Sequence, residues 1–193
     1  MLLNIYYLNI IVYNMALKNK QRILNLGCGS DTDGTDFADL YPSRDNIIKC
    51  NIETEQLPYA DSTFDIIIAH GLLQHITNLP NFFNECKRTL KKGGTLDILV
   101  ANAGFWGIFG STFYGKYDSS IKKKGMTEGK AYLLFTPTSI KNILHQYGFR
   151  DVRCSYQIAS TNKKNNPYHI VAINAATLLN RRLNPHIRVT AKK

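Results

Sequence analysis

Short apolar runs separated by turn-forming residues recur along this chain at the spacing of an α/β protein. The run 23–26 does not alternate between apolar and polar positions, which is typical of a strand buried on both faces of a sheet. The run 64–70 is the most apolar in the chain and ends at Gly71. The pattern predicts strands at 23–26, 35–40, 46–50, 64–70, 95–100, 149–160 and 186–191.

Helical periodicity separates several of these runs. Residues 80–90 carry apolar side chains at helical spacing and a basic C-terminal half, and we expect the glycines at 93–94 to end this helix. Residues 136–148 show the same periodicity behind a Thr-Pro start, and further helices are predicted at 72–76 and 167–183. Strands that alternate with helices indicate an α/β fold, with a doubly wound, mostly parallel, seven-stranded sheet and helices on both faces. The pattern leaves open whether an end strand is antiparallel.

The connection after the first strand is unusually short. Residues 30–35 are rich in turn formers, and the next strand begins directly after them. A crossover helix has almost no room there, so we expect it to be missing or reduced to a turn.

The length of 193 residues fits one domain with a full core. Residues 1–14 are almost entirely apolar or Asn, too few to span a bilayer, and we expect them to be an N-terminal extension outside a single domain at 15–193. A peripheral membrane anchor is the alternative for this extension. Residues 101–134 are rich in glycine and aromatic residues without a clear period, and we predict a lid or substrate-binding cap.

Composition says little about the functional class of the protein. The net charge of +10 suits a polyanionic partner, but it also suits simple solubility. The four cysteines form no CxxC pair, which favours free thiols in a reducing compartment and hence a cytoplasmic protein. We predict no metal site, because His, Cys, Asp and Glu are nowhere clustered at metal-ligand spacing.

A Gly-x-Gly turn follows the first strand, at Gly27 and Gly29. Glycines at a strand end let the backbone approach a ligand, and ligands in open α/β sheets lie at the carboxyl ends of the strands. An ordinary tight turn is the alternative. The third glycine of a dinucleotide-binding fingerprint is replaced by Thr32, which disfavours a nicotinamide-dependent oxidoreductase.

Four motifs in order carry a resemblance to a known family: LNLGCG at 24–29, LPYADSTFD at 57–65, LLQHI at 72–76 and ECKRTLKKGG at 85–94. In these motifs the chain resembles the class I S-adenosylmethionine-dependent methyltransferases, in particular the small-molecule type 11 group. The resemblance covers about residues 20–100. It implies a Rossmann-like fold, S-adenosylmethionine as cofactor and methyl transfer as the activity.

The resemblance also implies roles for individual residues. Gly27 and Gly29 would approach the methionyl part of the cofactor, and the Asp39 carboxylate would bind the ribose hydroxyls. Asn51 and Ile52 stand where the family contacts adenine. The full set implied to bind the cofactor is Leu26, Gly27, Cys28, Gly29, Asp39, Asn51, Ile52, His70 and Gly71.

The sequence departs from the family pattern at three points. Asn51 stands where the family usually has an acid, and Gln74 stands where a Glu is common. Because the first crossover is short, Asp36 is an alternative to Asp39 as the ribose ligand. These departures keep open a second class of function, a cofactor-binding protein without catalysis.

Two histidines are candidates for a general base, because their ordinary pKa lies near neutrality. His70 and Gly71 would border the methionine and the methyl group, and His75 follows about one helical turn later. The alternative is structural: His70 would only shape the pocket, and His75 would cap or pack the short helix.

The expected partner is a small-molecule acceptor, methylated at oxygen, nitrogen or carbon. The aromatic residues of 101–134 would line its pocket or form the small core of the insertion itself. The positive charge keeps RNA as an alternative acceptor, although the chain shows no separate RNA-binding module.

Overall fold

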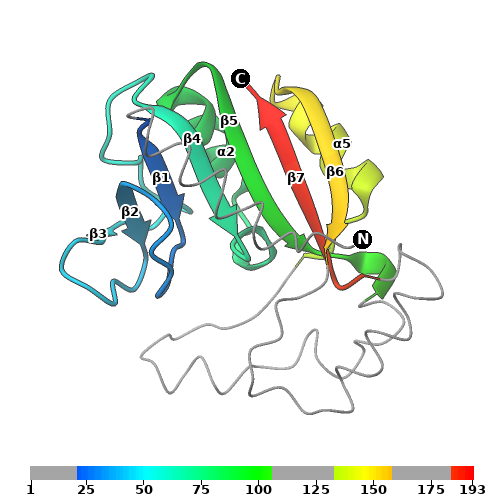
Figure 1. Ribbon diagram of the computed structural model, residues 1–193, viewed down its shortest axis with the longest axis horizontal. Helices are drawn as coiled ribbons and strands as arrows, with labels where there is room; N and C mark the ends of the chain where they lie inside the picture. Colours follow the sequence, from blue (N-terminus) through cyan, green and yellow to red (C-terminus); the bar gives the residue numbers. More distant parts are fainter. Residues whose placement is uncertain (1–20, 106–132, 158–183) are drawn as a thin grey trace, which may run out of the picture.

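The computed structural model describes residues 21–105, 133–157 and 184–193 (Figure 1). Within these ranges the strands form one seven-stranded sheet in the order β3-β2-β1-β4-β5-β7-β6. The strands are β1 Ile23–Leu26, β2 Asp36–Asp39, β3 Ile48–Lys49, β4 Phe64–His70, β5 Leu90–Ala101, β6 Arg150–Gln157 and β7 His186–Lys192. This confirms the predicted α/β fold with its mostly parallel sheet.

The first five strands are parallel, and β7 is inserted antiparallel between β5 and β6. Seven residue pairs join β5 to β7, from Thr95 opposite Lys192 to Ala101 opposite His186. The chain runs outward from β1 in both directions, so the strand order reverses between β1 and β4. Ligands of such sheets bind in the crevice at this reversal, beyond the carboxyl ends of the strands.

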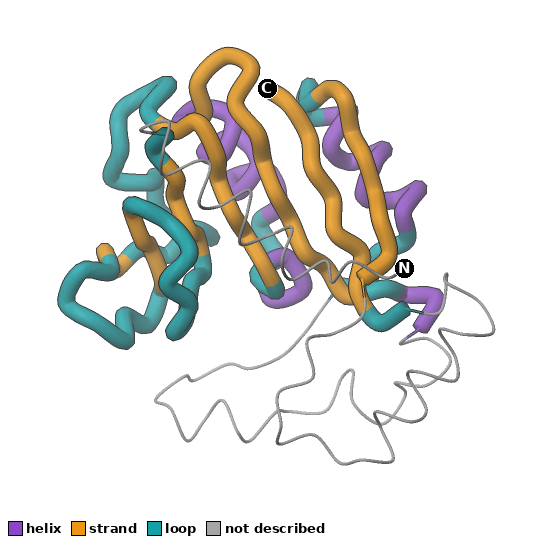
Figure 2. Tube along the Cα trace, in the orientation of Figure 1, coloured by secondary structure: helices purple, strands orange, loops and turns teal. Residues whose placement is uncertain are grey.

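Two described helices, α2 Leu79–Thr89 and α5 Pro137–Gln146, pack against the same face of the sheet (Figure 2). On β5 this face presents Leu96, Ile98 and Val100, none of which is exposed to solvent. A single turn of 3-10 helix, η1 Leu73–His75, follows β4 at the place of the predicted helix 72–76. No helix in the described ranges is long and apolar enough to cross a membrane.

The glycines at 93–94 do not end the preceding helix, contrary to the sequence prediction. Helix α2 ends at Thr89, and Leu90 already has extended backbone and pairs with Phe64 of β4. The residues after Thr89 join the sheet because burying an apolar side chain beside β4 stabilises the fold more than one further turn of helix would. Strand β5 therefore starts five residues earlier than predicted, and the glycines lie within it.

The missing first crossover helix is confirmed. Strands β1 and β2 pair directly, and no residue between them is helical. Side chains hold this connection instead: Asn25 Nδ2 donates to the Asp33 carbonyl at 3.0 Å, and the Ile23 N–H donates to Thr35 Oγ1 at 2.9 Å.

The predicted start of α5 is also confirmed. The Thr136 side chain accepts from the Ser139 N–H at 3.0 Å, and Ser139 Oγ accepts from the Thr136 N–H at 2.9 Å, which completes a capping box. The extension 1–14, the predicted helix 167–183 and residues 106–132 of the predicted lid lie outside the described residues.

An ion pair on α2 links the sequence motif at 85–94 to the motif at 57–65. Glu85 is 5% exposed and accepts from the Leu57 N–H at 2.7 Å, and Arg88 donates to Glu85 through both Nε and Nη2. Arg88 also donates to the carbonyls of Leu57 and Tyr59 and to the Asp61 carboxylate. The helix thereby holds the loop that leads into β4. These contacts keep the pKa of Glu85 below its usual value, with the hydrogen bond from Arg88 as the largest cause.

Replacing Arg88 with Ala should destabilise the fold strongly. The change leaves Glu85 buried without its cation and frees two backbone carbonyls of the loop. We expect a loss of about 3 kcal/mol, the lower end of the range for breaking a buried ion pair, because Arg88 is 26% exposed. Urea denaturation measures it, with exposed Lys92→Ala as the control. Equal stability of the two variants would contradict this role of the ion pair.

Candidate active site

The candidate site lies at the carboxyl ends of β1, β2 and β4, where the strand order reverses. Three glycines line this edge with left-handed backbone: Gly27 at φ 68°, Gly29 at φ 53° and Gly71 at φ 71°. Side chains rarely adopt this conformation, so the backbone explains why glycine stands at each position.

The surroundings of Gly27 and Gly29 differ. A Cβ on Gly27 would lie 2.7 Å from Leu72 Cδ1, so the missing side chain makes room for Leu72 next to η1. A Cβ on Gly29 would meet no atom of the described residues within 4 Å. The turn is thus closed on the Leu72 side and open above Gly29.

The N–H groups of Gly27 and Gly29 both have acceptors within the chain. The Gly27 N–H donates to the Ala38 carbonyl, and the Gly29 N–H donates to Asp39 Oδ2, each at 2.8 Å. The N–H groups of Cys28 and Ser30 have no acceptor among the described residues. In this turn the N–H groups of Cys28 and Ser30 therefore remain available as donors among the described residues.

Asp39 fixes the glycine turn from the end of β2. Its Oδ2 accepts from Gly29 and its Oδ1 accepts from the Tyr41 N–H, both at 2.8 Å, and the residue is 8% exposed. Each carboxylate oxygen keeps a second lone pair for another donor. Asp36, the alternative ribose ligand, lies at the opposite end of β2, where Arg22 pairs with it at 2.7 Å. Of the two acids of β2, Asp39 is therefore the one that lies at the carboxyl end of the strand, beside the glycine turn.

Three further predicted residues can contribute only through their backbones. Leu26 and Ile52 have their side chains in the main core, at 1% and 6% exposure. Cys28 is 6% exposed, and burial raises the pKa of its thiol to about 11, so the thiol is protonated at neutral pH. Asn51 follows β3, and its side-chain oxygen accepts from the Glu53 N–H at 3.1 Å, which leaves its amide N–H₂ as a donor.

His70 is the last residue of β4, and its side chain is 31% exposed. Its Nε2 lies 3.5 Å from Oδ1 of Asp97, a buried residue of β5. Arg188 of β7 holds the same carboxylate through two bonds, Nε to Oδ1 at 3.0 Å and Nη2 to Oδ2 at 2.6 Å. Sequence reasoning missed Asp97 and Arg188, although a single acid inside the apolar strand 95–100 was a visible signal.

Gly71 and His75 continue from the end of β4. The Gly71 N–H donates to the Leu99 carbonyl at 2.8 Å, and the His75 N–H donates to the Leu72 carbonyl at 2.9 Å within η1. His75 therefore has its backbone fixed within the turn that follows the candidate base His70.

The described ends of the predicted lid lie beside η1. The Leu133 N–H donates to the Gln74 carbonyl at 3.3 Å, and Asn102 bridges to Phe135. The chain thus leaves the sheet after β5 and returns to it next to the residues that follow β4.

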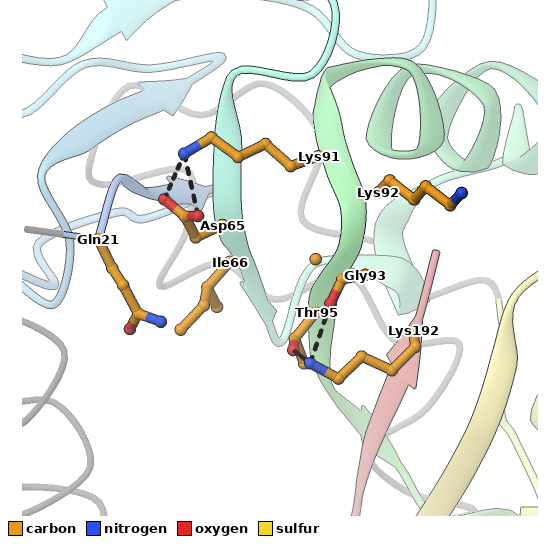
Figure 3. Close-up of a pocket in the computed structure, with 9 residues that line it drawn as sticks. Gln21, Asp65, Ile66, Lys91, Lys92, Gly93, Thr95 and Lys192 are labelled. Carbon is orange, nitrogen blue, oxygen red and sulfur yellow. Dashed lines mark hydrogen bonds and ion pairs between the residues drawn. The ribbon is translucent and has the colours of Figure 1, made fainter. Parts of the chain in front are cut away.

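A separate cavity of about 180 Å³ lies at the opposite edge of the sheet, among the residues shown in Figure 3. Lys91 donates there to both oxygens of Asp65, and Lys192 donates to the Gly93 carbonyl and to Thr95 Oγ1. These polar groups already have partners within the chain, so the cavity is not the candidate site.

Comparison with known families agrees with this geometry. The family model described as a methyltransferase domain matches residues 31–98, which run from the glycine turn into β5. Residues 31–98 thus match a methyltransferase domain. This confirms the family that the four sequence motifs indicated.

Curated relatives are distant and longer. The sterol 24-C-methyltransferase of Schizosaccharomyces pombe is 26% identical over 137 residues, which cover 58% of this chain and 34% of that protein. The malonyl-[acyl-carrier protein] O-methyltransferase of Geobacter sulfurreducens is 24% identical over 153 residues, with 68% and 56% covered. The chain thus spans about a third to just over half the length of these two relatives.

Solved structures share the fold at low identity. A SAM-dependent methyltransferase from Archaeoglobus fulgidus has a TM-score of 0.56 at 16% identity, and the match covers 95% of this chain and 94% of that one. Phosphoethanolamine N-methyltransferase 2 of Haemonchus contortus, solved with S-adenosyl-L-methionine, has a TM-score of 0.51 at 16% identity, with 94% and 52% covered.

Asp39→Asn should loosen the glycine turn of this methyltransferase domain. An amide presents one oxygen and one N–H₂ group, so one of the two backbone donors, Gly29 or Tyr41, loses its acceptor. We expect a loss of about 1–3 kcal/mol in the free energy of unfolding. Denaturation and hydrogen exchange at these two amides measure the effect. The exposed Asp45→Asn is the control, and unchanged amide protection in Asp39→Asn would contradict the role.

Proposed function

We propose that the protein transfers a methyl group from S-adenosylmethionine to a small-molecule acceptor. The observation that carries the proposal is the open space above Gly29, next to a buried carboxylate at the strand-order reversal of a methyltransferase domain. The solved phosphoethanolamine N-methyltransferase that shares this fold holds the same cofactor.

The residues at this edge fit the cofactor by their chemistry. The free N–H groups of Cys28 and Ser30 suit its carboxylate, and the remaining lone pairs of Asp39 suit the ribose hydroxyls. Asn51 offers an amide to the adenine edge, and the Ile52 backbone lies next to it. When bound, the cofactor supplies an electrophilic methyl group on a sulfonium.

The chain itself orients the acceptor and removes its proton where the reaction needs this. His70 and Gly71 border the site at the end of β4, and we assign His70 the role of general base. His75 is the second candidate, because η1 places it directly after that strand end. For an acceptor without a dissociable proton, both histidines would only orient it.

Acceptor recognition is assigned to residues 101–134. The described ends of this segment lie beside η1, which supports a place next to the methyl group. Its aromatic residues would exclude water from the reaction.

A labelled-methyl assay tests the activity directly. Purified protein is given S-adenosylmethionine with a labelled methyl group together with pooled small-molecule acceptors, and products are read by mass shift. An RNA pool is the second arm, because the charge of +10 keeps RNA as the alternative acceptor. Cofactor binding without any methylated product would favour the non-catalytic alternative.

Gly29→Ala should abolish cofactor binding without unfolding the protein. The new methyl group enters the space assigned to the ligand. Gly93→Ala is a matched control, since Gly93 also has positive φ and nothing within 4 Å of its Cβ position, at the other edge of the sheet. Both variants should lose about 1–2 kcal/mol of stability from backbone strain. Calorimetry with S-adenosylhomocysteine should show at least a tenfold loss of affinity for Gly29→Ala alone, and equal affinities would place the ligand elsewhere.

Trp106→Ala should impair acceptor use and spare the cofactor. We expect a higher KM for the acceptor found in the screen, or a lower kcat, with unchanged affinity for S-adenosylhomocysteine. Steady-state kinetics and calorimetry separate the two effects. An unaltered KM and kcat would remove the aromatic insertion from acceptor recognition.

A further inference from the structure

A buried carboxylate stands directly behind the candidate base. Asp97 is 7% exposed in the middle of β5, on the strand face opposite to Leu96 and Ile98. The register places His70 across from Leu99, two residues further along β5, so the imidazole and the carboxylate share one face. Burying a charge at this position costs desolvation energy. The packing of the sheet does not by itself call for a charged residue there.

The contact involves one particular nitrogen of the imidazole. Among the described residues, the buried His70 Nε2 has no hydrogen-bond partner, and Asp97 Oδ1 lies 3.5 Å from it. The nearest acceptor for a proton on Nε2 is therefore this carboxylate. In a neutral ring with its proton on Nε2, the lone pair is on Nδ1.

We propose that Asp97 is a positioning residue for His70. It holds the imidazole with the proton on Nε2 and leaves Nδ1 as the base. This rests on the proposed function. Nδ1 would take the proton of the acceptor as the acceptor's lone pair bonds the methyl carbon that the bound cofactor would supply, with the C–S bonding pair left on its sulfur. The Asp97 carboxylate then faces the imidazolium that this proton transfer creates, and the proton finally passes to water.

Arg188 keeps Asp97 charged for this purpose. Burial alone would raise the pKa of Asp97, but the nearby His70 imidazole and the hydrogen-bonded Arg188 guanidinium hold it below its usual value. The carboxylate therefore stays an acceptor at neutral pH. Among the described residues, Asp33 in the β1–β2 connection also interacts electrostatically with the His70 imidazole.

The test reads the tautomer of His70 by ¹⁵N NMR in the full-length protein, with His70→Gln to assign the ring signals. Wild type should show the proton on Nε2. Asp97→Asn should shift the ring signals toward a mixture of tautomers. Because Asp97→Asn removes the anion that Arg188 holds through two hydrogen bonds, the double variant Asp97→Asn/Arg188→Gln removes both charges and should give the same shift. Asp65→Asn, at the opposite edge of the sheet, is the control and should leave the signals unchanged.

Kinetics supply the second readout. Asp97→Asn and the double variant should lower kcat at least about tenfold, part of the 10²–10⁴ that a general base contributes, with unchanged affinity for S-adenosylhomocysteine. A wild-type proton on Nδ1, or identical His70 signals in wild type and both variants, would overturn the proposal. Failure of wild type to bind S-adenosylhomocysteine would instead overturn the proposed function, whatever the tautomer.

Discussion

The ion pair between Glu85 and Arg88 is the contact on which the geometry of the site depends. It lies at the end of α2 and holds the backbone of the loop before β4 through hydrogen bonds to Leu57 and Tyr59. The Tyr59 ring packs edge-on against Phe64, the first residue of β4, with centroids 4.8 Å apart. The start of β4 is therefore fixed relative to the helix, and the strand register carries this position to the other end, where the candidate base lies.

The glycine turn is built differently because the first crossover helix is missing. In an α/β sheet a helix that begins at this turn would direct its N-terminal N–H groups at the ligand. Here the Asp39 carboxylate organises the turn through Gly29 and Tyr41. One acid thereby serves the fold and, in the proposed function, the cofactor. Under that proposal, a substitution of Asp39 would affect cofactor binding as well as stability.

The two faces of β5 show how the sheet separates packing from chemistry. Leu96, Ile98 and Val100 meet the helices and are fully buried, as an ordinary core requires. The other face carries Asp97, whose charge is compensated by Arg188 from the antiparallel strand β7. A buried, paired acid contributes little net stability, so its presence beside His70 is better explained by the chemistry proposed at that residue.

The sequence by itself determined most of the elements and pointed to the edge of the sheet at which the candidate site lies. Hydrophobic periodicity is local, so it located β4 at 64–70 and the start of α5 at Thr136, and the paired glycines marked the end of β1. Only the tertiary structure decided the partners. The early end of α2 at Thr89, the insertion of β7 between β5 and β6, and the meeting of Asp97 with Arg188, 91 residues away, all depend on strand pairing. Pairing is set by the packing of the whole sheet, and no local pattern encodes which distant strand supplies the compensating charge.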